Sequence, residues 1–197
     1  SYSCAVRANL VDQELCALLN ELNVTDVGMG AESFSDRILE YYNKKRVTGD
    51  INQMALDMLH AHRIKVNPSF IFGAPIETRD DMLTTLRKIH VNLAEGKMHA
   101  PTWATLIPYP GTKIWEYALE HSIVGIDMDW NKFASVSDTM YMCEHVSHKE
   151  FSDLIREWLV KNSLILRKNP DRGGSFVIRG KDNLRRAVEM VYQDIKT

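Results

Sequence analysis

The sequence predicts an α/β fold of four consecutive parallel β/α units, followed by a mainly helical extension. Three observations support this prediction. Strand-like and helix-like patterns alternate over the first 120 residues, each strand runs through a loop into a helix with a cap residue, and the alternation stops near His121. We therefore expect residues 1–120 to form a core and residues 121–197 to form the extension.

The first two units extend to about residue 60. A strand near Cys4–Asn9 precedes a helix that begins at Asp12, and a strand near Thr25–Met29 precedes two helices that begin at Ser35 and Thr48. Asp, Ser and Thr are preferred N-cap residues. The apolar faces expected on these three helices are, in order, Leu15, Leu18, Leu19 and Leu22; Ile38, Leu39 and Tyr42; and Ile51, Met54, Ala55, Met58 and Leu59.

The third unit has a strand near Val66–Phe72, and the fourth has a strand near Thr102–Ile107. Pro68 has no N–H for a strand ladder, so we expect it near the strand start or at a bulge. Thr78, with an acid three residues later, has the spacing of a capping box. Thr112 is expected to cap a short helix after the fourth strand. The helix after Thr78 is expected to bury Met82, Leu83, Leu86, Ile89 and Leu93.

The extension has a different organisation. Residues Gly125–Met142 show no clear period, and we expect them to form a lid across the strand ends. A second capping box, Ser147 to Glu150, begins a helix that ends at Asn169-Pro170. That helix is expected to bury Phe151, Leu154, Ile155, Trp158 and Leu159, and a last helix is expected to bury Leu184, Val188, Val191 and Ile195.

Composition excludes two classes of partner. The formal net charge is -2 and the Lys and Arg residues are scattered, so no basic surface for nucleic acid is expected. The apolar stretches are far shorter than the ~20 residues of a membrane-spanning helix, so no membrane partner is expected. No signal peptide pattern precedes them, and we therefore expect a cytoplasmic protein.

The three cysteines, Cys4, Cys16 and Cys143, are far apart and odd in number. This fits neither a disulfide framework nor a metal-binding CxxC motif, and we expect all three to pack as small apolar side chains. The chain opens with Ser1 and runs almost at once into strand-like residues. That pattern favours a cut made inside a longer protein.

Three segments at predicted strand ends carry motifs. They are Gly28–Ser33 (GMGAES), Phe70–Thr78 (FIFGAPIET) and Leu106–Thr112 (LIPYPGT), and Asn43-Lys44 follows the first. In this order they resemble strand ends of the radical S-adenosylmethionine (radical SAM) superfamily, where the fourth strand ends in G-x-E-S, the fifth in G-x-P-x-E-T and the sixth in P-Y-P-G-T. The resemblance covers roughly Val6–Glu120.

The resemblance implies an open partial TIM barrel in which the four units are strands three to six of six. It also implies a [4Fe-4S] cluster on a C-x-x-x-C-x-x-C loop, with S-adenosylmethionine (SAM) bound to the fourth iron and cleaved to a 5'-deoxyadenosyl radical. Such clusters need thiolate ligands, and this chain lacks three cysteines at that spacing. The loop and two strands are therefore expected upstream of Ser1, and the chain alone is expected to be inactive.

Candidate SAM contacts begin at the second strand end. Glycines there let a ligand approach the backbone closely, so Gly28 and Gly30 could form the floor of a nucleoside pocket. The resemblance implies that Glu32, with Ser33 beside it, meets the SAM ribose, whose diol a carboxylate can bind with two hydrogen bonds. The alternative is a buried ion pair between Glu32 and Arg7, and the two roles can coexist.

The remaining candidate contacts follow from the same resemblance. Lys44 matches a basic position for the SAM carboxylate, and the alternative is a solvated surface lysine. Ser69 stands where the family often has the first glycine of its fifth-strand motif, and Gly73 could join the pocket floor. Ile107 and Tyr109 match positions that make apolar and backbone contacts to adenine.

Glu77 has two interpretations. It comes one residue later than the acid of the fifth-strand family pattern G-x-I-x-G-x-x-E, so its contact with a ligand is one alternative. An acid at a helix N-terminus is also favoured by the helix dipole. We favour the second interpretation, in which Glu77 serves the helix that begins at Thr78.

For the full-length protein, the resemblance implies an oxidoreductase or transferase with SAM and a [4Fe-4S] cluster as cofactors. Relatives with these motifs often add a cobalamin domain and act in methyl transfer or tetrapyrrole chemistry. A small-molecule substrate and an electron donor such as flavodoxin or ferredoxin are the implied partners. The edge at Cys4–Asn9 is expected to be covered by another chain, either a partner or a second copy, or by the C-terminal segment. The alternative function is a degenerate binding or interaction module without cluster or catalysis.

Overall fold

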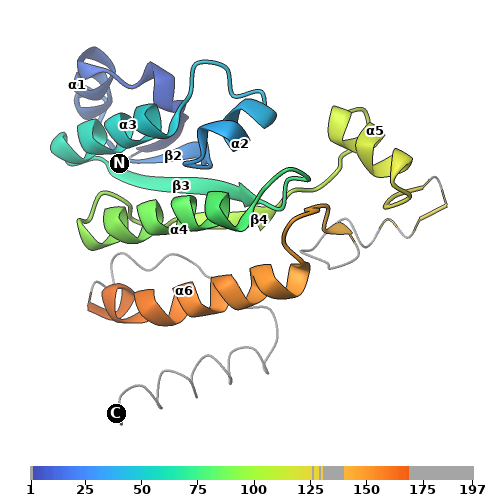
Figure 1. The fold of residues 1–197 in the computed structure, drawn as a ribbon. Helices are drawn as coiled ribbons and strands as arrows, with labels where there is room; N and C mark the ends of the chain where they lie inside the picture. The colour runs from blue at the N-terminus through green and yellow to red at the C-terminus, as the bar shows by residue number, and fades with distance from the viewer. Residues whose placement is uncertain (1, 126, 129, 131–139, 169–197) are drawn as a thin grey trace, which may run out of the picture.

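Four parallel strands form one open sheet (Figure 1). The structure, a computed structural model, describes residues 2–125, 127–128, 130 and 140–168. Each strand pairs with the next one along the chain, in the order β1-β2-β3-β4. The strands are β1 (Tyr2–Val6), β2 (Val24–Glu32), β3 (Lys65–Phe72) and β4 (Thr102–Thr105). The predicted fold class is therefore confirmed.

The two faces of the sheet differ. In β2 and β3 buried side chains alternate with partly exposed ones. Right-handed crossovers between successive parallel strands place all the connecting helices on one face, and Figure 1 shows α3 and α4 in front of the sheet. The buried positions on this side include Val27, Met29, Val66 and Phe70. The opposite, partly exposed positions include Gly28, Gly30, Asn67 and Ser69.

Helix caps match the sequence predictions at most helix starts. The Asp12, Thr48 and Thr112 side chains each accept a hydrogen bond from the backbone of the first turn, and Thr78 forms the predicted capping box. Ser35 differs, because its hydroxyl donates to Asp81. The elements are η1 (Ala8–Leu10), α1 (Gln13–Glu21), α2 (Asp36–Tyr41), α3 (Gly49–Ala61), α4 (Arg79–Ala94), α5 (Lys113–Glu120) and α6 (His148–Lys168).

The buried face of α3 is rotated from the predicted one. Met54 was expected inside but is 62% exposed, whereas Leu56 is fully buried. Asn52, a polar residue, is also fully buried. The reason is that α3 packs against η1 as well as β3, so its buried stripe includes residues that a single apolar face does not predict. In α1, Leu18 and Leu22 are likewise exposed.

Two strand predictions need correction. The first strand ends at Val6, and the 3-10 helix at Ala8–Leu10 replaces its expected second half. Pro68 lies in the middle of β3 instead of near its start, and the β2–β3 bulge falls elsewhere, between Gly30 and Glu32. The β3–β4 ladder begins only at Ser69, so Pro68 interrupts no pairing with β4.

The extension contributes to the main core. Trp158 of α6 is buried, its indole N–H donates to the Leu86 carbonyl of α4 at 2.9 Å, and its ring meets Trp103 edge to face. A smaller apolar cluster around Ala118 packs α5 against Val124, Met140 and Met142. The expected last helix, with Leu184, Val188, Val191 and Ile195, lies outside the described residues, as does most of the expected lid.

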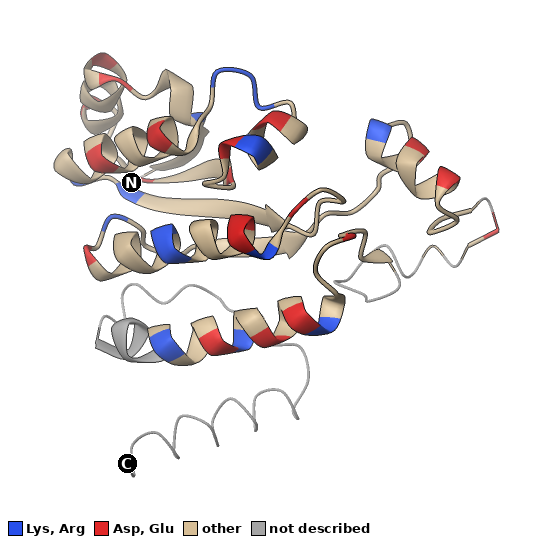
Figure 2. Cartoon of the chain, viewed as in Figure 1, with Lys and Arg blue, Asp and Glu red and all other residues tan. Residues whose placement is uncertain are grey.

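Charges of both signs are interspersed along α4 and α6 (Figure 2). No described helix is long and apolar enough to cross a membrane. Cys16 is buried and Cys143 is partly buried, but Cys4 is exposed on β1, so its predicted packing role was wrong. Cys4 lies on an edge strand that has only β2 as a neighbour among the described strands, and this explains its exposure.

Candidate functional site

The candidate site lies where β2 ends. Glu32, the last residue of β2, has a left-handed backbone with φ 62°, and the strand register shifts between Gly30 and Glu32. Such a conformation is uncommon for a residue with a side chain and is often found at binding sites. The bulge turns the Glu32 carboxylate back across Gly30, and a Cβ on Gly30 would stand 2.7 Å from Glu32 Oε1.

A buried amide supports this bulge. The Asn52 side chain, fully buried on α3, donates to the Ala31 carbonyl at 3.0 Å and to the Ser33 carbonyl at 2.9 Å. These two carbonyls flank Glu32 in the chain. Asn52 therefore holds both sides of the strained residue. Sequence reasoning missed it, because Asn52 lies outside the apolar face that periodicity predicts for α3.

Lys44 completes a cluster with Gly30 and Glu32. Its Nζ lies 2.9 Å from Glu32 Oε1 and donates to the Gly30 carbonyl at 3.2 Å. Both side chains of the ion pair remain partly exposed, at 25% and 14%. The alternative pairing of Glu32 with Arg7 is wrong, because the partner is Lys44 and Arg7 is exposed. The alternative that Lys44 is only a solvated surface lysine is also wrong, because its Nζ contacts the Glu32 carboxylate and the Gly30 carbonyl.

The loop after β3 is organised by Glu77. Its carboxylate is fully buried, and Oε2 accepts hydrogen bonds from the Gly73 N–H at 2.6 Å and the Ala74 N–H at 3.3 Å. The Thr78 and Asp81 side chains cap α4, and Glu77 lies directly before this cap, so its favourable interaction with the helix dipole stays a prediction. Burial raises the pKa of Glu77 to about 7, against the lowering effect of the two backbone hydrogen bonds.

A partly buried tyrosine lies near both acids. Tyr42, at the end of α2, donates its hydroxyl to the Ile71 carbonyl at 3.4 Å. Burial raises the pKa of Tyr42 strongly, and the charges of Glu77 and Glu32 raise it further. The phenol therefore stays protonated over the physiological range. Tyr42 was predicted only as an apolar contact of α2, so its polar role was missed.

Comparison with known proteins shows what the chain is similar to. No protein-family model matches the chain. An uncharacterised methyltransferase of Pyrococcus horikoshii is 29% identical over 163 residues, or 80% of this chain and 33% of that protein. The chain thus spans about a third of the length of this relative.

Among solved structures, coproporphyrinogen III oxidase (HemN) of Escherichia coli, described as a radical SAM enzyme, matches 83% of this chain and 32% of its own, with a TM-score of 0.54 and 14% identity. Elp3 of the archaeon Methanocaldococcus infernus matches 82% of this chain and 42% of its own, with a TM-score of 0.52 and 17% identity. The chain has the fold of part of a radical SAM barrel.

A third similar structure was solved with bound cofactors. TsrM of Kitasatospora setae, a radical SAM methyltransferase solved with cobalamin and a [4Fe-4S] cluster, matches 70% of this chain and 29% of its own, with a TM-score of 0.50 and 16% identity. In the present chain, no three His, Cys, Asp or Glu side chains among the described residues gather as metal ligands. These residues therefore do not supply a ligand set for an iron-sulfur cluster.

The structure also shows where the other predicted site residues lie. Ser69 pairs with Gly30 across the sheet and lies on the same partly exposed face. Ser33 is buried, and its hydroxyl bonds with Thr85 at 3.0 Å and accepts from the Ser35 N–H, so it is committed to packing β2 against α4. Arg7, Ile107 and Tyr109 are not in the Glu32 cluster: Arg7 follows β1, and the other two follow β4.

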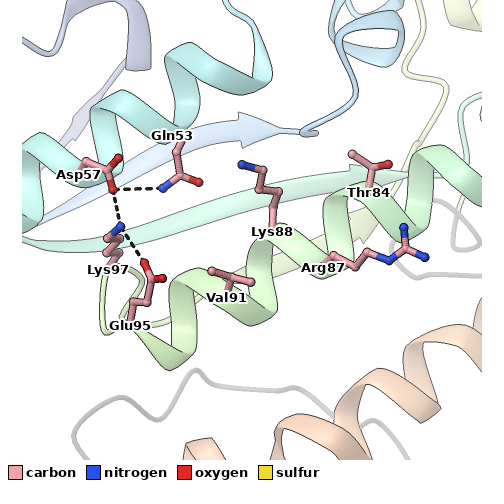
Figure 3. Close-up of a pocket in the computed structure, with 8 residues that line it drawn as sticks. All are labelled: Gln53, Asp57, Thr84, Arg87, Lys88, Val91, Glu95 and Lys97. Atoms are coloured by element: carbon pink, nitrogen blue, oxygen red, sulfur yellow. Dashed lines mark hydrogen bonds and ion pairs between the residues drawn. The ribbon is translucent and has the colours of Figure 1, made fainter.

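A concave surface lies away from the Glu32 cluster. It is a groove between α3 and α4, where Gln53, Lys97, Asp57 and Glu95 interact (Figure 3). Lys97 Nζ lies 2.7 Å from both Asp57 Oδ1 and Glu95 Oε2, so its charge is already neutralised. The groove lies between helices, on the side of the sheet opposite to Gly30 and Ser69, and is separate from the site at the strand ends.

Proposed function

We propose that residues 1–197 form the SAM-binding part of a radical SAM enzyme. The observation that carries the proposal is the cluster of Glu32, Gly30 and Lys44 at the carboxyl end of β2. In parallel α/β sheets, ligands bind at the carboxyl ends of the strands. The strained backbone at Glu32 is maintained by Asn52, as expected for a side chain that must be oriented before its ligand arrives.

The chemistry of the cluster fits a nucleoside with a carboxylate tail. Glu32 Oε1 faces Lys44, while the carboxylate retains acceptor capacity for the two hydroxyls of a ribose. Gly30 leaves room for the Glu32 carboxylate, since a Cβ there would stand 2.7 Å from Glu32 Oε1. Lys44 neutralises Glu32 in the free protein and supplies the positive charge for the SAM carboxylate.

The cluster and the reaction belong to the full-length protein. We propose that the [4Fe-4S] ligands lie outside residues 1–197 and that an external donor such as flavodoxin or ferredoxin reduces the cluster. With SAM bound, such a cluster supplies radical chemistry, and this chain binds and orients SAM. The name of the Pyrococcus horikoshii relative supports methyl transfer as the reaction class, and the cobalamin bound in the TsrM structure supports cobalamin as a third cofactor.

The proposal is tested by SAM affinity in the full-length protein. Glu32→Gln removes the charge but keeps one acceptor, so we expect SAM affinity to fall about ten- to a hundredfold, the effect of losing roughly 1.5–3 kcal/mol of charge-assisted hydrogen bonding. Gly30→Ala should act through the same carboxylate, because the new Cβ would displace Glu32 Oε1 from its present position. Isothermal titration calorimetry with SAM measures both effects.

Thr84→Ala is the control. Thr84 is exposed on α4, away from the Glu32 cluster, and is not among the candidate SAM contacts. We expect this variant to bind SAM like the parent. If all three variants bind SAM like the parent while Glu32→Gln melts at a lower temperature, the Glu32 cluster is structural and the alternative of a module without SAM chemistry gains support.

A further inference from the structure

Residues 141–144, which we name the strap, lie against the loop Gly73–Glu77. The Glu144 N–H donates to the Pro75 carbonyl at 3.0 Å, and the Cys143 thiol donates to the Glu77 carbonyl at 3.0 Å. The Tyr141 ring covers Gly73, and a Cβ on Gly73 would approach its Cε2 to 2.9 Å. Three strap residues in four therefore contact a loop that lies far away in sequence.

The strap also holds α5. The Tyr117 hydroxyl of α5 donates to Glu144 Oε1 at 2.5 Å. Met142, within the strap, packs into the small apolar cluster with Ala118 of α5. The strap is therefore anchored on two sides, by α5 and by the loop.

The loop needs an external support of this kind. Gly73 has φ 88°, a left-handed backbone conformation. Within the loop the Glu77 carboxylate accepts from the Gly73 and Ala74 N–H groups, and the Glu77 N–H donates to the Ala74 carbonyl at 2.9 Å. Glu77 Oε1 is buried without a hydrogen-bond partner. This unpaired acceptor weakens the loop's own contacts, so the strap that packs over the loop adds to its stability.

We propose that the strap holds the Gly73–Glu77 loop in the conformation that receives SAM, with Cys143 as a positioning residue. This inference rests on the proposed function for its SAM part. The strap comes from the extension, beyond the stretch of resemblance, yet it meets the end of β3 next to the β2 cluster.

The first experiment needs no SAM. Hydrogen exchange of the Gly73 and Ala74 amides is measured in the full-length protein, relative to the amides of β3. Cys143→Ala removes the donor to the Glu77 carbonyl, and we expect the relative exchange to rise about two- to tenfold, as for the loss of one hydrogen bond. Cys143→Ser retains a donor, so we expect its relative exchange to stay within about twofold of that of the parent. Cys16→Ala, in the core, should leave the ratio unchanged.

The second experiment measures SAM affinity of the same variants by calorimetry. We expect Cys143→Ala to weaken SAM binding about two- to tenfold, Cys143→Ser to bind like the parent, and Cys16→Ala to lower only the melting temperature. Unchanged exchange and affinity in Cys143→Ala, or no rescue by serine, overturns the strap proposal. If exchange rises but the parent itself binds no SAM, the proposed function fails and only the structural hold of the strap stands.

Discussion

At the scale of single residues, the strained backbone of Glu32 is the clearest sign of function. A residue with a side chain in the left-handed region costs of the order of 1–3 kcal/mol unless its surroundings stabilise it. Here Asn52 donates to the carbonyls on both sides, and Lys44 pairs with the carboxylate. A simple strand end would need none of these contacts. The strain is therefore consistent with a carboxylate that is held ready for a ligand.

The second residue with an unusual environment, Glu77, predicts a pH dependence of stability. Its pKa is about 7 in the folded chain against an ordinary 4.5. The folded state therefore holds the proton more tightly, and the free energy of unfolding falls as pH rises. The stabilising contribution is complete below about pH 4.5 and is lost as pH rises through about 7. The free energy of unfolding falls by roughly 3 kcal/mol over this range.

Denaturant unfolding of the parent and Glu77→Gln from pH 4.5 to pH 8 measures this contribution. We expect the stability difference between the two proteins to change in favour of the variant as pH rises, because Gln cannot ionise but still accepts from the Gly73 N–H. The contributions of other titrating groups to stability cancel in the difference between the two proteins. A difference that is constant across this range would show that Glu77 is ionised throughout.

At the scale of elements, the rotated face of α3 gives a prediction. Leu56 is fully buried, so Leu56→Ala should lower the free energy of unfolding by about 2–5 kcal/mol through lost burial and a cavity. Met54 is 62% exposed, so Met54→Ala should change it by less than about 0.5 kcal/mol. Urea unfolding followed by circular dichroism compares the two. The reverse order would favour the face that periodicity alone predicts.

The element that joins core and extension is α6. It packs on α4 through Trp158, and its Asn162 bonds His90 Nδ1 at 2.8 Å. Both contacts link residues that lie 72 positions apart. Helix α6 thus covers the outer side of a core helix, while the strap before it reaches the strand ends.

At the scale of the whole molecule, the exposed edge of β1 is the main unsatisfied feature. Residues Tyr2–Ala5 are all exposed, and β1 pairs only with β2 among the described strands. An unpaired edge is a template for another strand. We therefore expect the 197-residue chain, expressed alone, to self-associate in a concentration-dependent way, as sedimentation velocity would show.

Ala5→Lys places a charge on this edge and should shift the chain toward monomer. Thr84→Lys, which adds the same charge on the exposed side of α4, is the control and should associate like the parent. A chain that is monomeric at all concentrations, or two variants with equal effects, would contradict an edge-mediated association.

Much of the fold could be predicted from the sequence because its signals are local. The caps at Asp12, Thr48 and Thr78 depend on side chains within three residues of the helix start, and the parallel order follows from alternation and handedness. The same applies to the strand-end motifs, which brought Glu32, Gly30 and Lys44 forward as candidates before any contact was known. The resemblance of these motifs to radical SAM strand ends selected the residues, because the three motifs occur here in the same order.

The tertiary structure decided which partners these residues have. Lys44 rather than Arg7 pairs with Glu32, because the β2 bulge turns the carboxylate toward the end of α2. Only the tertiary structure shows three further residues near the site, through contacts between separate elements: Asn52, Tyr42 and Cys143. No local pattern encodes such contacts, since burial and hydrogen bonding between elements depend on how the elements pack. The sequence determined the elements and the candidate residues, and packing determined the geometry of the site.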